Sequence, residues 1–364
     1  MNKKLLSGIK KILVTGGLGF IGSNYIIKIL KETNIKILNL DKKGYASSDY
    51  GIKNTLNNLE ESHIRNYLYQ RVNLTKEKNL DVIISDFEPD LIVNFAAESH
   101  VDRSIESPEI FIENNILGTF NLLEATRKFL AKSNQQKRKS FKFHHISTDE
   151  VFGSLGEDGF FNEENPYKPR SPYSASKASS DHLVFAWNHT YGLPVIISNC
   201  SNNYGPWQFP EKLIPLVILK ALSKKDIPIY GKGENIRDWL FVDDHIDALI
   251  HLASFGKDGE NYCIGGNNEV KNVDLVKMIC ALLNKYRPFE NDYASLIKFV
   301  RDRPGHDFRY AIDSSKIQNQ IGWIPVHSLK DGLEKTILWY LENIEWCNFV
   351  MNNAKYGGQR IGKL

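Results

Sequence analysis

Tyr173 and Lys177 have the residue types and the spacing of a pair that moves protons. They stand one helical turn apart on an expected helix that includes residues 172–179, so their side chains share one face. A phenol is a poor base at neutral pH, and a neighbouring ammonium lowers its pKa by stabilising the phenolate. We therefore expect Tyr173 to take the proton of a substrate hydroxyl while the same carbon gives a hydride to a cofactor.

A glycine-rich segment near the start of the chain predicts where that cofactor binds. Gly16, Gly19 and Gly22 are spaced three residues apart, between an expected strand at residues 11–15 and an expected helix at residues 20–33. Glycines there permit a tight turn and let a pyrophosphate approach the free N–H groups at the start of the helix. The pattern predicts a dinucleotide-binding loop.

Asp41 ends the next expected strand, at residues 35–41. Its carboxylate can accept hydrogen bonds from the adenosine ribose and would repel a 2′-phosphate, which favours NAD over NADP. The neighbouring Lys42 and Lys43 leave some tolerance of NADP open.

The glycine loop combined with Tyr173 and Lys177 resembles the extended short-chain dehydrogenase/reductase superfamily. Thr148 stands where that superfamily has a Ser or Thr that hydrogen-bonds the reacting hydroxyl. Asp149 and Glu150 follow it directly, at the end of an expected strand over residues 141–147, where ligands of parallel sheets bind. Once a ketone forms at C4 of a sugar, elimination across C5–C6 needs a base at C5 and an acid at the C6 oxygen. Glu150 and Asp149 can divide those roles if their environments separate their pKa values.

Longer matching stretches resemble one branch of that superfamily, the dTDP-glucose 4,6-dehydratases, over nearly the whole chain. The stretches are Thr148-Asp149-Glu150-Val151, Tyr173-Ser174-Ala175-Ser176-Lys177, and the segments 96–104, 199–206, 210–215, 236–239 and 302–307. This resemblance implies an NAD-dependent hydro-lyase acting on a nucleotide sugar, with hydride returned to C6.

The resemblance also implies the binding residues. The cofactor site comprises Gly16, Gly19, Phe20, Ile21, Gly22, Asp41, Lys42, Asn73, Leu74, Ala96, Ala97, Ser99, Asn114, Tyr173, Lys177 and Asn203. The substrate site comprises Ser99, Thr148, Asn202, Lys212, Leu213, Pro228, Tyr230, Arg237, Asn272, Asp302, Arg303 and His306. Asn73 replaces a frequent Asp and Asn114 a frequent Thr, and His100 is expected to shape the nicotinamide pocket.

Alternating strand and helix patterns in the first half predict an α/β fold, a Rossmann-type doubly wound parallel sheet. Further strands are expected at residues 67–71, 91–95 and 195–198, and a long helix at residues 108–130. We expect an NAD-binding domain over residues 1–198 and a smaller mixed α/β substrate lobe over residues 199–345, with the chain crossing between them. A polar tail is expected over residues 346–364.

Composition favours an ordinary globular enzyme. A hydrophobic share of 42% with 24% charged residues argues against disorder, and a formal charge of +3 is too small to indicate nucleic-acid binding. The four cysteines and ten histidines lack metal-ligand spacing, so we expect no metal and no disulfide framework. Neither a signal peptide nor a membrane span is indicated, and we expect a cytoplasmic protein.

Four other functions stay open at this point. A sugar-nucleotide epimerase generally lacks the carboxyl pair after the Thr, and a UDP-glucuronate decarboxylase typically has Thr-Ser-Glu there, so Asp149 argues against both. A UDP-sugar dehydratase differs only in the base it recognises, and a silent NAD-binding protein would not need Tyr173, Lys177 and Glu150. The resemblance also implies a homodimer joined through the helices at residues 108–130 and 174–191.

Overall fold

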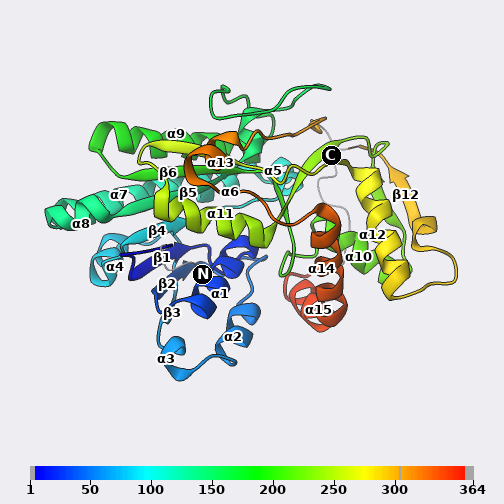
Figure 1. Cartoon of the computed structure of the whole chain (residues 1–364), viewed down its shortest axis with the longest axis horizontal. Coiled ribbons are helices and arrows are strands. Elements are labelled where there is room, and N and C mark those ends of the chain that lie inside the picture. The colour runs from blue at the N-terminus through cyan, green and yellow to red at the C-terminus, as the bar shows by residue number, and fades with distance from the viewer. Residues whose placement is uncertain (1–4, 303–304, 357–364) are drawn as a thin grey trace.

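The larger lobe is built on a seven-stranded parallel sheet (Figure 1), as the alternating pattern predicts. The computed structural model describes residues 5–302 and 305–356. The strand order is β10-β6-β5-β4-β1-β2-β3, so the chain runs outward in opposite directions from the β1–β4 pair. The strands are β1 (Lys11–Thr15), β2 (Lys36–Asp41), β3 (Tyr67–Arg71), β4 (Leu91–Asn94), β5 (Lys142–Thr148), β6 (Val195–Cys200) and β10 (Glu260–Ile264). Such a reversal opens a crevice at the carboxyl ends of the strands, where ligands of doubly wound folds bind.

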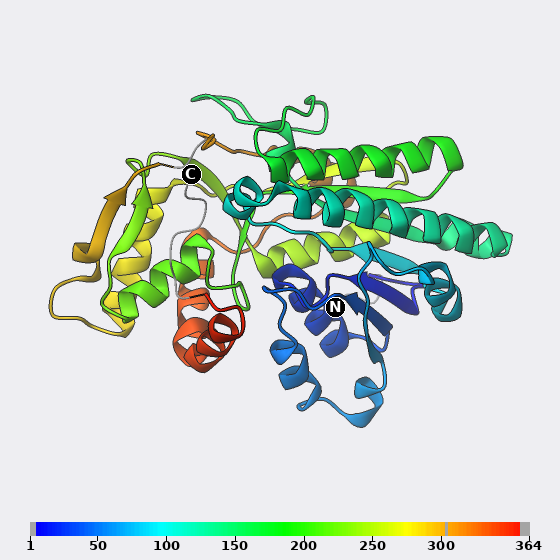
Figure 2. The same cartoon turned by 180° about the vertical axis from the view of Figure 1, so that it is seen from behind.

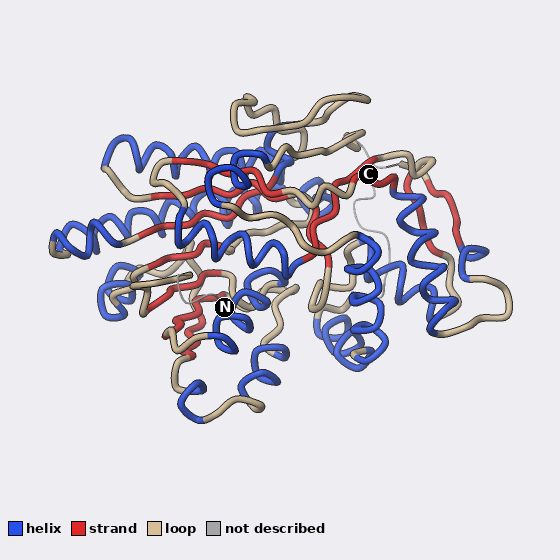
Figure 3. The backbone as a smooth tube through the Cα atoms, viewed as in Figure 1, coloured by secondary structure: helices blue, strands red, loops and turns tan. Residues whose placement is uncertain are grey.

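Helices cover both faces of this sheet (Figure 3), which is why the central strands β1 and β4 are almost continuously apolar. One face carries α1 (Phe20–Glu32), α2 (Tyr50–Leu56), α11 (Val242–Phe255) and α13 (Ser315–Ile321). The other carries α4 (Leu80–Phe87), α7 (Gly118–Lys132) and α9 (Pro172–Tyr191), seen in front in Figure 2. Short helices complete the lobe: α3 (Glu61–Ile64), α5 (Val101–Glu106), α6 (Pro108–Phe111), α8 (Gln135–Ser140) and the 3₁₀ turn η2 (Asp149–Phe152).

The smaller lobe lies beyond the carboxyl edge of the large sheet and has its own apolar core. It holds a three-stranded sheet of β7 (Asn202–Tyr204), β9 (Ile236–Phe241) and β11 (Glu269–Lys271), and a parallel pair of β8 (Ile227–Tyr230) and β12 (Ile297–Val300). Its helices are α10 (Leu213–Leu222), α12 (Asn272–Tyr286), the 3₁₀ turn η3 (Tyr293–Leu296), α14 (Leu329–Glu342) and α15 (Ile344–Asn353).

The chain crosses between the lobes repeatedly, as expected. After β9 it returns to the large sheet through α11 and β10, and β10 pairs in parallel with β6. It then enters the small lobe again, comes back for α13 and finishes in α14 and α15. A single boundary after residue 198 therefore does not separate two continuous domains, because β10, α11 and α13 belong to the larger lobe.

The helix expected over residues 108–130 is not one regular helix. Between α6 and α7 the chain forms a six-residue π-helix, η1 (Ile112–Leu117). Asn115 lies in it, fully buried, and its amide donates to the Glu98 carbonyl oxygen and to Ser176 Oγ. An insertion of this kind turns a side chain toward a functional site in many helices, and here it joins the cavity loop after β4 to α9.

The prediction of a polar tail that begins at residue 346 is wrong for residues 346–353. Residues 346–353 belong to α15, with Trp346, Cys347 and Val350 buried in the core of the small lobe. Trp346 packs edge-on against Trp207 and Trp339, and its indole N–H donates to Ser48 Oγ in the loop after β2. Tyr356 is buried as well, and residues 357–364 lie outside the described part of the chain.

Helix α9 is fixed at both ends by its own sequence. Ser171 caps its start in a reciprocal capping box with Ser174, and Pro172 occupies the first turn. Gly192 ends it in the left-handed conformation. These signals set which residues of α9 face the sheet, and they turn Tyr173 and Lys177 inward. Within residues 5–302 and 305–356, no helix has the length and apolar character needed to cross a membrane.

Candidate active site

A cavity of about 520 Å³ lies between the two lobes at the carboxyl edge of the large sheet. The structure brings nearly every predicted site residue to its wall. Those of the predicted cofactor site are Gly16, Gly19, Phe20, Ile21, Gly22, Asp41, Lys42, Asn73, Leu74, Ala96, Ala97, Ser99, Asn114, Tyr173, Lys177 and Asn203. The others are Thr148, Asp149, Glu150, Asn202, Lys212, Leu213, Pro228, Tyr230, Arg237, Asn272 and His306.

The glycine loop between β1 and α1 fits a pyrophosphate. Gly16 has a φ of +68°, and a Cβ there would lie 2.6 Å from the backbone nitrogen of Ala96. A Cβ on Gly22 would lie 2.6 Å from the carbonyl oxygen of Gly16. Helix α1 begins after Gly19 with no side-chain cap, so backbone alone faces a ligand at the positive end of the helix dipole.

Asp41 is held at the end of β2 as the sequence predicts. Its carboxylate accepts hydrogen bonds from the backbone N–H groups of Leu18 and Lys43, at 3.0 and 2.7 Å, and from Ser47 Oγ at 3.2 Å. Burial raises the pKa of this carboxyl while those hydrogen bonds lower it. The side chain therefore braces the glycine loop as well as lining the cavity.

The two lysines after Asp41 both have acidic partners. Lys42 Nζ lies 2.6 Å from Glu98 Oε1 and donates to Asn114 Oδ1 at 2.8 Å, while Lys43 Nζ lies 3.4 Å from Asp49. A 2′-phosphate would have to compete with these carboxylates. The arrangement thus favours NAD over NADP more strongly than the sequence alone.

The two departures from the family pattern have local roles. Asn73 Oδ1 accepts from the backbone N–H and the hydroxyl of Thr75, closing the turn after β3. Asn114 holds Lys42 and donates its amide to the Ile110 carbonyl oxygen. Both residues line the cavity, but the oxygen of Asn73 is already used by its own turn.

Asp149 and Glu150 have different environments, as their proposed roles require. Asp149 is 1% exposed, and its Oδ2 has no hydrogen-bond partner among the described residues. Burial and the charges of Glu150 and Asp238 raise its pKa well above the usual range of a carboxyl. Glu150 is only partly buried, and its backbone N–H donates to Thr148 Oγ1 at 3.3 Å. A carboxyl kept protonated beside an accessible one suits an acid and a base.

Tyr173 and Lys177 both line the cavity, and the prediction that the lysine and a positive nicotinamide ring together lower the pKa of the phenol stays a prediction. Burial and the negative charge of Glu150 raise the pKa of Tyr173 well above its ordinary value, while its hydrogen bond with Thr148 lowers it. Lys177 Nζ donates to the Ile146 carbonyl oxygen at 2.8 Å and lies 3.3 Å from His145 Nε2. Burial lowers the pKa of Lys177.

The wall on the small-lobe side carries neutral and cationic groups. Arg237 is buried, stacks 4.4 Å from the Tyr310 ring centroid and donates to the carbonyl oxygens of Ile236, Asp307 and Phe308. Buried Oδ1 atoms of Asn202 and Asn272 have no hydrogen-bond partner among the described residues. Unpaired buried amides on a cavity wall are groups that a polar ligand satisfies.

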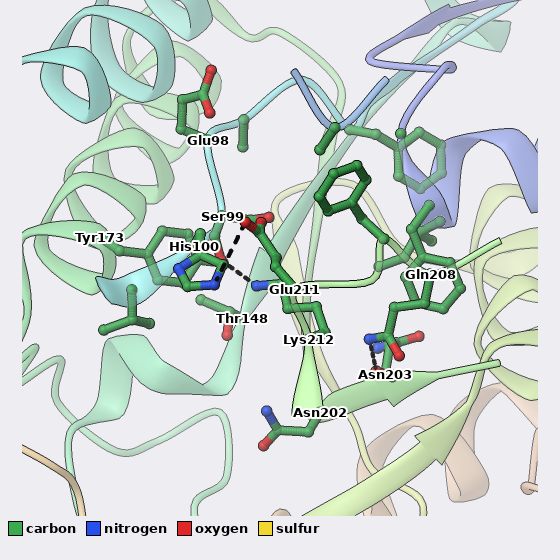
Figure 4. A pocket seen from close by; sticks show the side chains of 18 of the residues that line it. Glu98, Ser99, His100, Thr148, Tyr173, Asn202, Asn203, Gln208, Glu211 and Lys212 are labelled. Atoms are coloured by element: carbon green, nitrogen blue, oxygen red, sulfur yellow. Dashed lines mark hydrogen bonds and ion pairs between the residues drawn. The ribbon is translucent and has the colours of Figure 1, made fainter. Parts of the chain in front are cut away.

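Sequence reasoning missed a polar cluster where the lobes meet (Figure 4). Glu211, with a side chain 1% exposed, accepts from Tyr45 at 2.6 Å and from Arg103 at 3.2 Å, and lies 3.9 Å from His100 Nε2. Lys212 donates to the Ser99 carbonyl oxygen at 2.9 Å. A signal existed, because Glu211 adjoins Lys212 in one of the matching stretches. His100 lines the cavity and lies next to Glu211, and its expected role in shaping the nicotinamide pocket stays a prediction.

Residues 302–306 agree only in part with the predicted substrate site. His306 lines the cavity, and its Nδ1 lies 2.6 Å from Asp302 Oδ1. Asp302 supports His306 and is not itself on the cavity wall. Arg303 lies outside the described residues.

Comparisons with known proteins show the family to which the chain belongs. The model of the family described as GDP-mannose 4,6 dehydratase matches residues 13–336. The dTDP-glucose 4,6-dehydratase of Neisseria meningitidis serogroup B is 50% identical, covering 97% of this chain and 99% of its own length. The chain belongs to the dTDP-glucose 4,6-dehydratase family.

Solved structures of that family have the same fold. The dTDP-glucose 4,6-dehydratase of Bacillus anthracis, in complex with NAD, is 42% identical with a TM-score of 0.81, covering 93% of this chain and 99% of that one. DesIV of Streptomyces venezuelae, a dTDP-glucose 4,6-dehydratase solved with NAD bound, is 36% identical with a TM-score of 0.84 over the same shares.

Gly16→Ala should weaken NAD binding at least about tenfold, because the new Cβ meets the Ala96 backbone and the left-handed φ strains any other residue. Isothermal titration with NAD measures this. Gly8→Ala is the matched control, since Gly8 has a φ of +86° but nothing within 4 Å of the added Cβ. It should bind NAD as the unaltered chain does, and equal losses in the two variants would contradict the assignment.

Proposed function

We propose that this chain is an NAD-dependent dTDP-glucose 4,6-dehydratase, a hydro-lyase that converts dTDP-glucose to dTDP-4-keto-6-deoxyglucose. The observation that carries this proposal is the carboxyl pair. Asp149 is buried with a strongly raised pKa, and Glu150 lies next to it at the cavity beside Thr148 and Tyr173. Family membership at about half identity supports it.

The chain's own residues divide the proton transfers. Tyr173 accepts the proton of the C4 hydroxyl, which Thr148 orients, and Lys177 steadies the phenolate that results. When bound, NAD would supply the acceptor for the C4 hydride and its donor to C6, and its positive ring charge would offset the raised pKa of Tyr173. The glycine loop and Asp41 hold this cofactor against the edge of the sheet.

The carboxyl pair removes water while C4 is oxidised. Glu150 takes the C5 proton, made acidic by the adjacent ketone, and Asp149 gives its proton to the departing C6 oxygen. Because burial and Glu150 raise the pKa of Asp149, its protonated form is favoured, as an acid in this role requires. Each positioned transfer contributes on the order of 10²–10⁴-fold in rate.

The small-lobe wall supports a nucleoside diphosphate. Arg237 and Lys212 supply positive charge, and the unpaired amide oxygens of Asn202 and Asn272 supply acceptors. Pro228 and Tyr230, in β8, offer a surface for the base. The epimerase and decarboxylase alternatives leave Asp149 without a role, since neither reaction expels a C6 hydroxyl.

The state of the cysteines supports the proposed cellular location. All four, Cys200, Cys263, Cys280 and Cys347, are buried free thiols, which suits a reducing compartment such as the cytoplasm.

The second proposed property is a homodimer. The surface formed by η1, α7 and the end of α9 exposes a group of large apolar side chains, and exposed apolar groups of this kind mark interfaces. They are Ile112 at 49%, Leu117 at 43%, Phe120 at 37% and Tyr191 at 52%.

Replacing Leu117 and Phe120 together by Glu should convert the dimer to a monomer, because two charges would be buried in the contact. Sedimentation velocity measures the mass. The control is Phe299→Glu, which alters a side chain 60% exposed on β12 in the other lobe and should leave the dimer intact. A monomeric unaltered chain would contradict the proposal.

Purified protein supplied with dTDP-glucose should accumulate a 4-keto-6-deoxy sugar with no net NADH, because the cofactor is restored in each turnover. A panel of dTDP-, UDP-, CDP- and GDP-glucose read by a keto-sugar assay measures the base preference. One methyl contact separates thymine from uracil, so the preference for dTDP over UDP is expected at about 10–200-fold. Epimerised hexose, or no turnover with NAD present, would refute the function.

Glu150→Gln should oxidise C4 but stop exchange of the C5 proton, lowering turnover about 10²–10⁴-fold. Substrate deuterated at C5 tests this in ordinary water, and mass spectrometry should find the deuterium retained. Asp149→Asn is the paired variant: C5 exchange should continue while loss of water slows. Persistent exchange in Glu150→Gln would show that Glu150 is not the base.

A further inference from the structure

Behind the cavity wall lies a buried polar group that the mechanism above does not use. Asp181 is fully buried on α9, one helical turn after Lys177 and two turns after Tyr173, so all three lie on the face of α9 turned toward the sheet. A carboxylate in this position costs several kcal/mol of desolvation unless donors and a counter-charge compensate it. Its neighbours provide both.

Three donors converge on one oxygen of this carboxylate. Oδ2 accepts from Ser147 Oγ at 2.7 Å, from the Tyr167 hydroxyl at 3.0 Å and from Asn199 Nδ2 at 3.2 Å. The same amide of Asn199 donates to the Thr148 carbonyl oxygen at 3.2 Å, and Ser147 precedes Thr148 in β5. Asp181 is therefore linked directly to Ser147, the neighbour of Thr148, and through Asn199 to the carbonyl oxygen of Thr148.

The other oxygen faces the catalytic lysine through His145. Asn94 Nδ2 lies 3.0 Å from His145 Nδ1, and because Asn94 Oδ1 accepts from Thr15, the amide nitrogen is the donor to the ring. The hydrogen of the neutral imidazole is then assigned to Nε2, which lies 3.3 Å from Asp181 Oδ1 and 3.3 Å from Lys177 Nζ. The ring N–H is therefore directed at the carboxylate, and the ammonium of Lys177, which donates to the Ile146 carbonyl oxygen at 2.8 Å, lies beside the same ring nitrogen without donating to it.

We propose that Asp181 is a positioning residue of this active site, whose buried carboxylate is the counter-charge of Lys177 and fixes Thr148 through Ser147 and Asn199. It acts without touching cofactor or substrate. The inference rests on the proposed function for its catalytic meaning, but the pairing of Asp181 with Lys177 is measurable apart from turnover.

The remaining titratable neighbours leave Asp181 and Lys177 as the opposite charges. Burial and Lys177 lower the pKa of His145 to about 4, so a second cation does not form beside the lysine. Burial raises the pKa of Cys200, on β6, to about 12, and burial with Asp181 raises that of Tyr167, in the loop before α9. Tyr173 is also neutral, and Asp181 raises the pKa of Lys177 against the effect of burial.

Asp181→Asn tests this pairing by removing the charge with little change of shape. Without the anion the neutral amine of Lys177 is favoured, so its pKa falls and the amine is exposed to acylation at lower pH. Competitive acetylation with acetic anhydride across a pH series, read at Lys177 by mass spectrometry, should show a midpoint about one to two pH units lower. The alkaline limb of the turnover–pH profile should move down with it.

Tyr167→Phe is the matched control, since it removes a hydroxyl donor from the same Oδ2 but leaves the charge of the carboxylate. Its Lys177 midpoint should stay within about 0.3 pH units of that of the unaltered chain. An unchanged midpoint in Asp181→Asn overturns the proposal. A shifted midpoint in a protein that does not convert dTDP-glucose leaves the pairing standing and rejects the proposed function instead.

If Asp181→Asn does not fold, Ser147→Ala gives a second test of the proposal that Asp181 positions Thr148. Ser147→Ala and Tyr167→Phe each remove one hydroxyl donor to Oδ2, and thermal unfolding measures what each costs in stability. Ser147→Ala should lower kcat about tenfold with KM unchanged, because it loosens the strand end beside Thr148, while Tyr167→Phe should stay within about twofold. Equal losses of kcat would show that the network only stabilises the fold, and would overturn the proposal.

Discussion

Parallel pairing of seven strands is the constraint on which this active site depends. Parallel strands bring all their carboxyl ends to one edge, so the glycine loop after β1, Asp41 at the end of β2 and the carboxyl pair after β5 meet although the sequence separates them widely. The groups buried in the cavity wall at this edge lie in a low dielectric, which strengthens the charge interactions among them. The raised pKa values of Asp149 and Tyr173 follow from that burial.

Because the site is buried, its ionisable side chains need polar partners in the protein layer behind the cavity wall. Lys177, His145 and Asp181 are ionisable groups with little or no contact with water, and each is stabilised by named donors or acceptors rather than by solvent. The π-helical segment η1 serves the same purpose, because Asn115 reaches the loop after β4 and α9 at once. Catalytic groups on the wall therefore depend on a second layer of polar residues that never meets the ligand.

Much of this was predictable from sequence, and the reasons are specific. Six strands of the large sheet and the helices α1 and α9 were located because apolar runs, glycines and capping residues mark them locally. Strand β10 was missed because it follows a long excursion through the other lobe, and short strands there have no distinct local pattern. Helix α15 was taken for a polar tail because its apolar residues, Trp346, Cys347 and Val350, are few and its burial depends on distant Trp207 and Trp339. The sequence identified the cavity residues that lie in the matching stretches. It did not indicate the hydrogen-bond partners of Glu211 and Asp181, because only the tertiary fold brings those residues together.

The repeated passage of the chain between the lobes bears on how the molecule can move and change. Two lobes joined by one linker can twist and separate freely. Several chain segments that cross between the lobes side by side permit mainly a hinge-like opening about the crossing points. The smaller lobe is also not one continuous, exchangeable segment of the chain, because β10 and α13, which lie within and after it in the sequence, complete the sheet and a helical layer of the larger lobe. A chimera that exchanged the small lobe with a relative's would have to exchange segments of the cofactor lobe as well. New base or sugar specificities are therefore expected to arise by substitution within the cavity wall rather than by recombination of whole lobes.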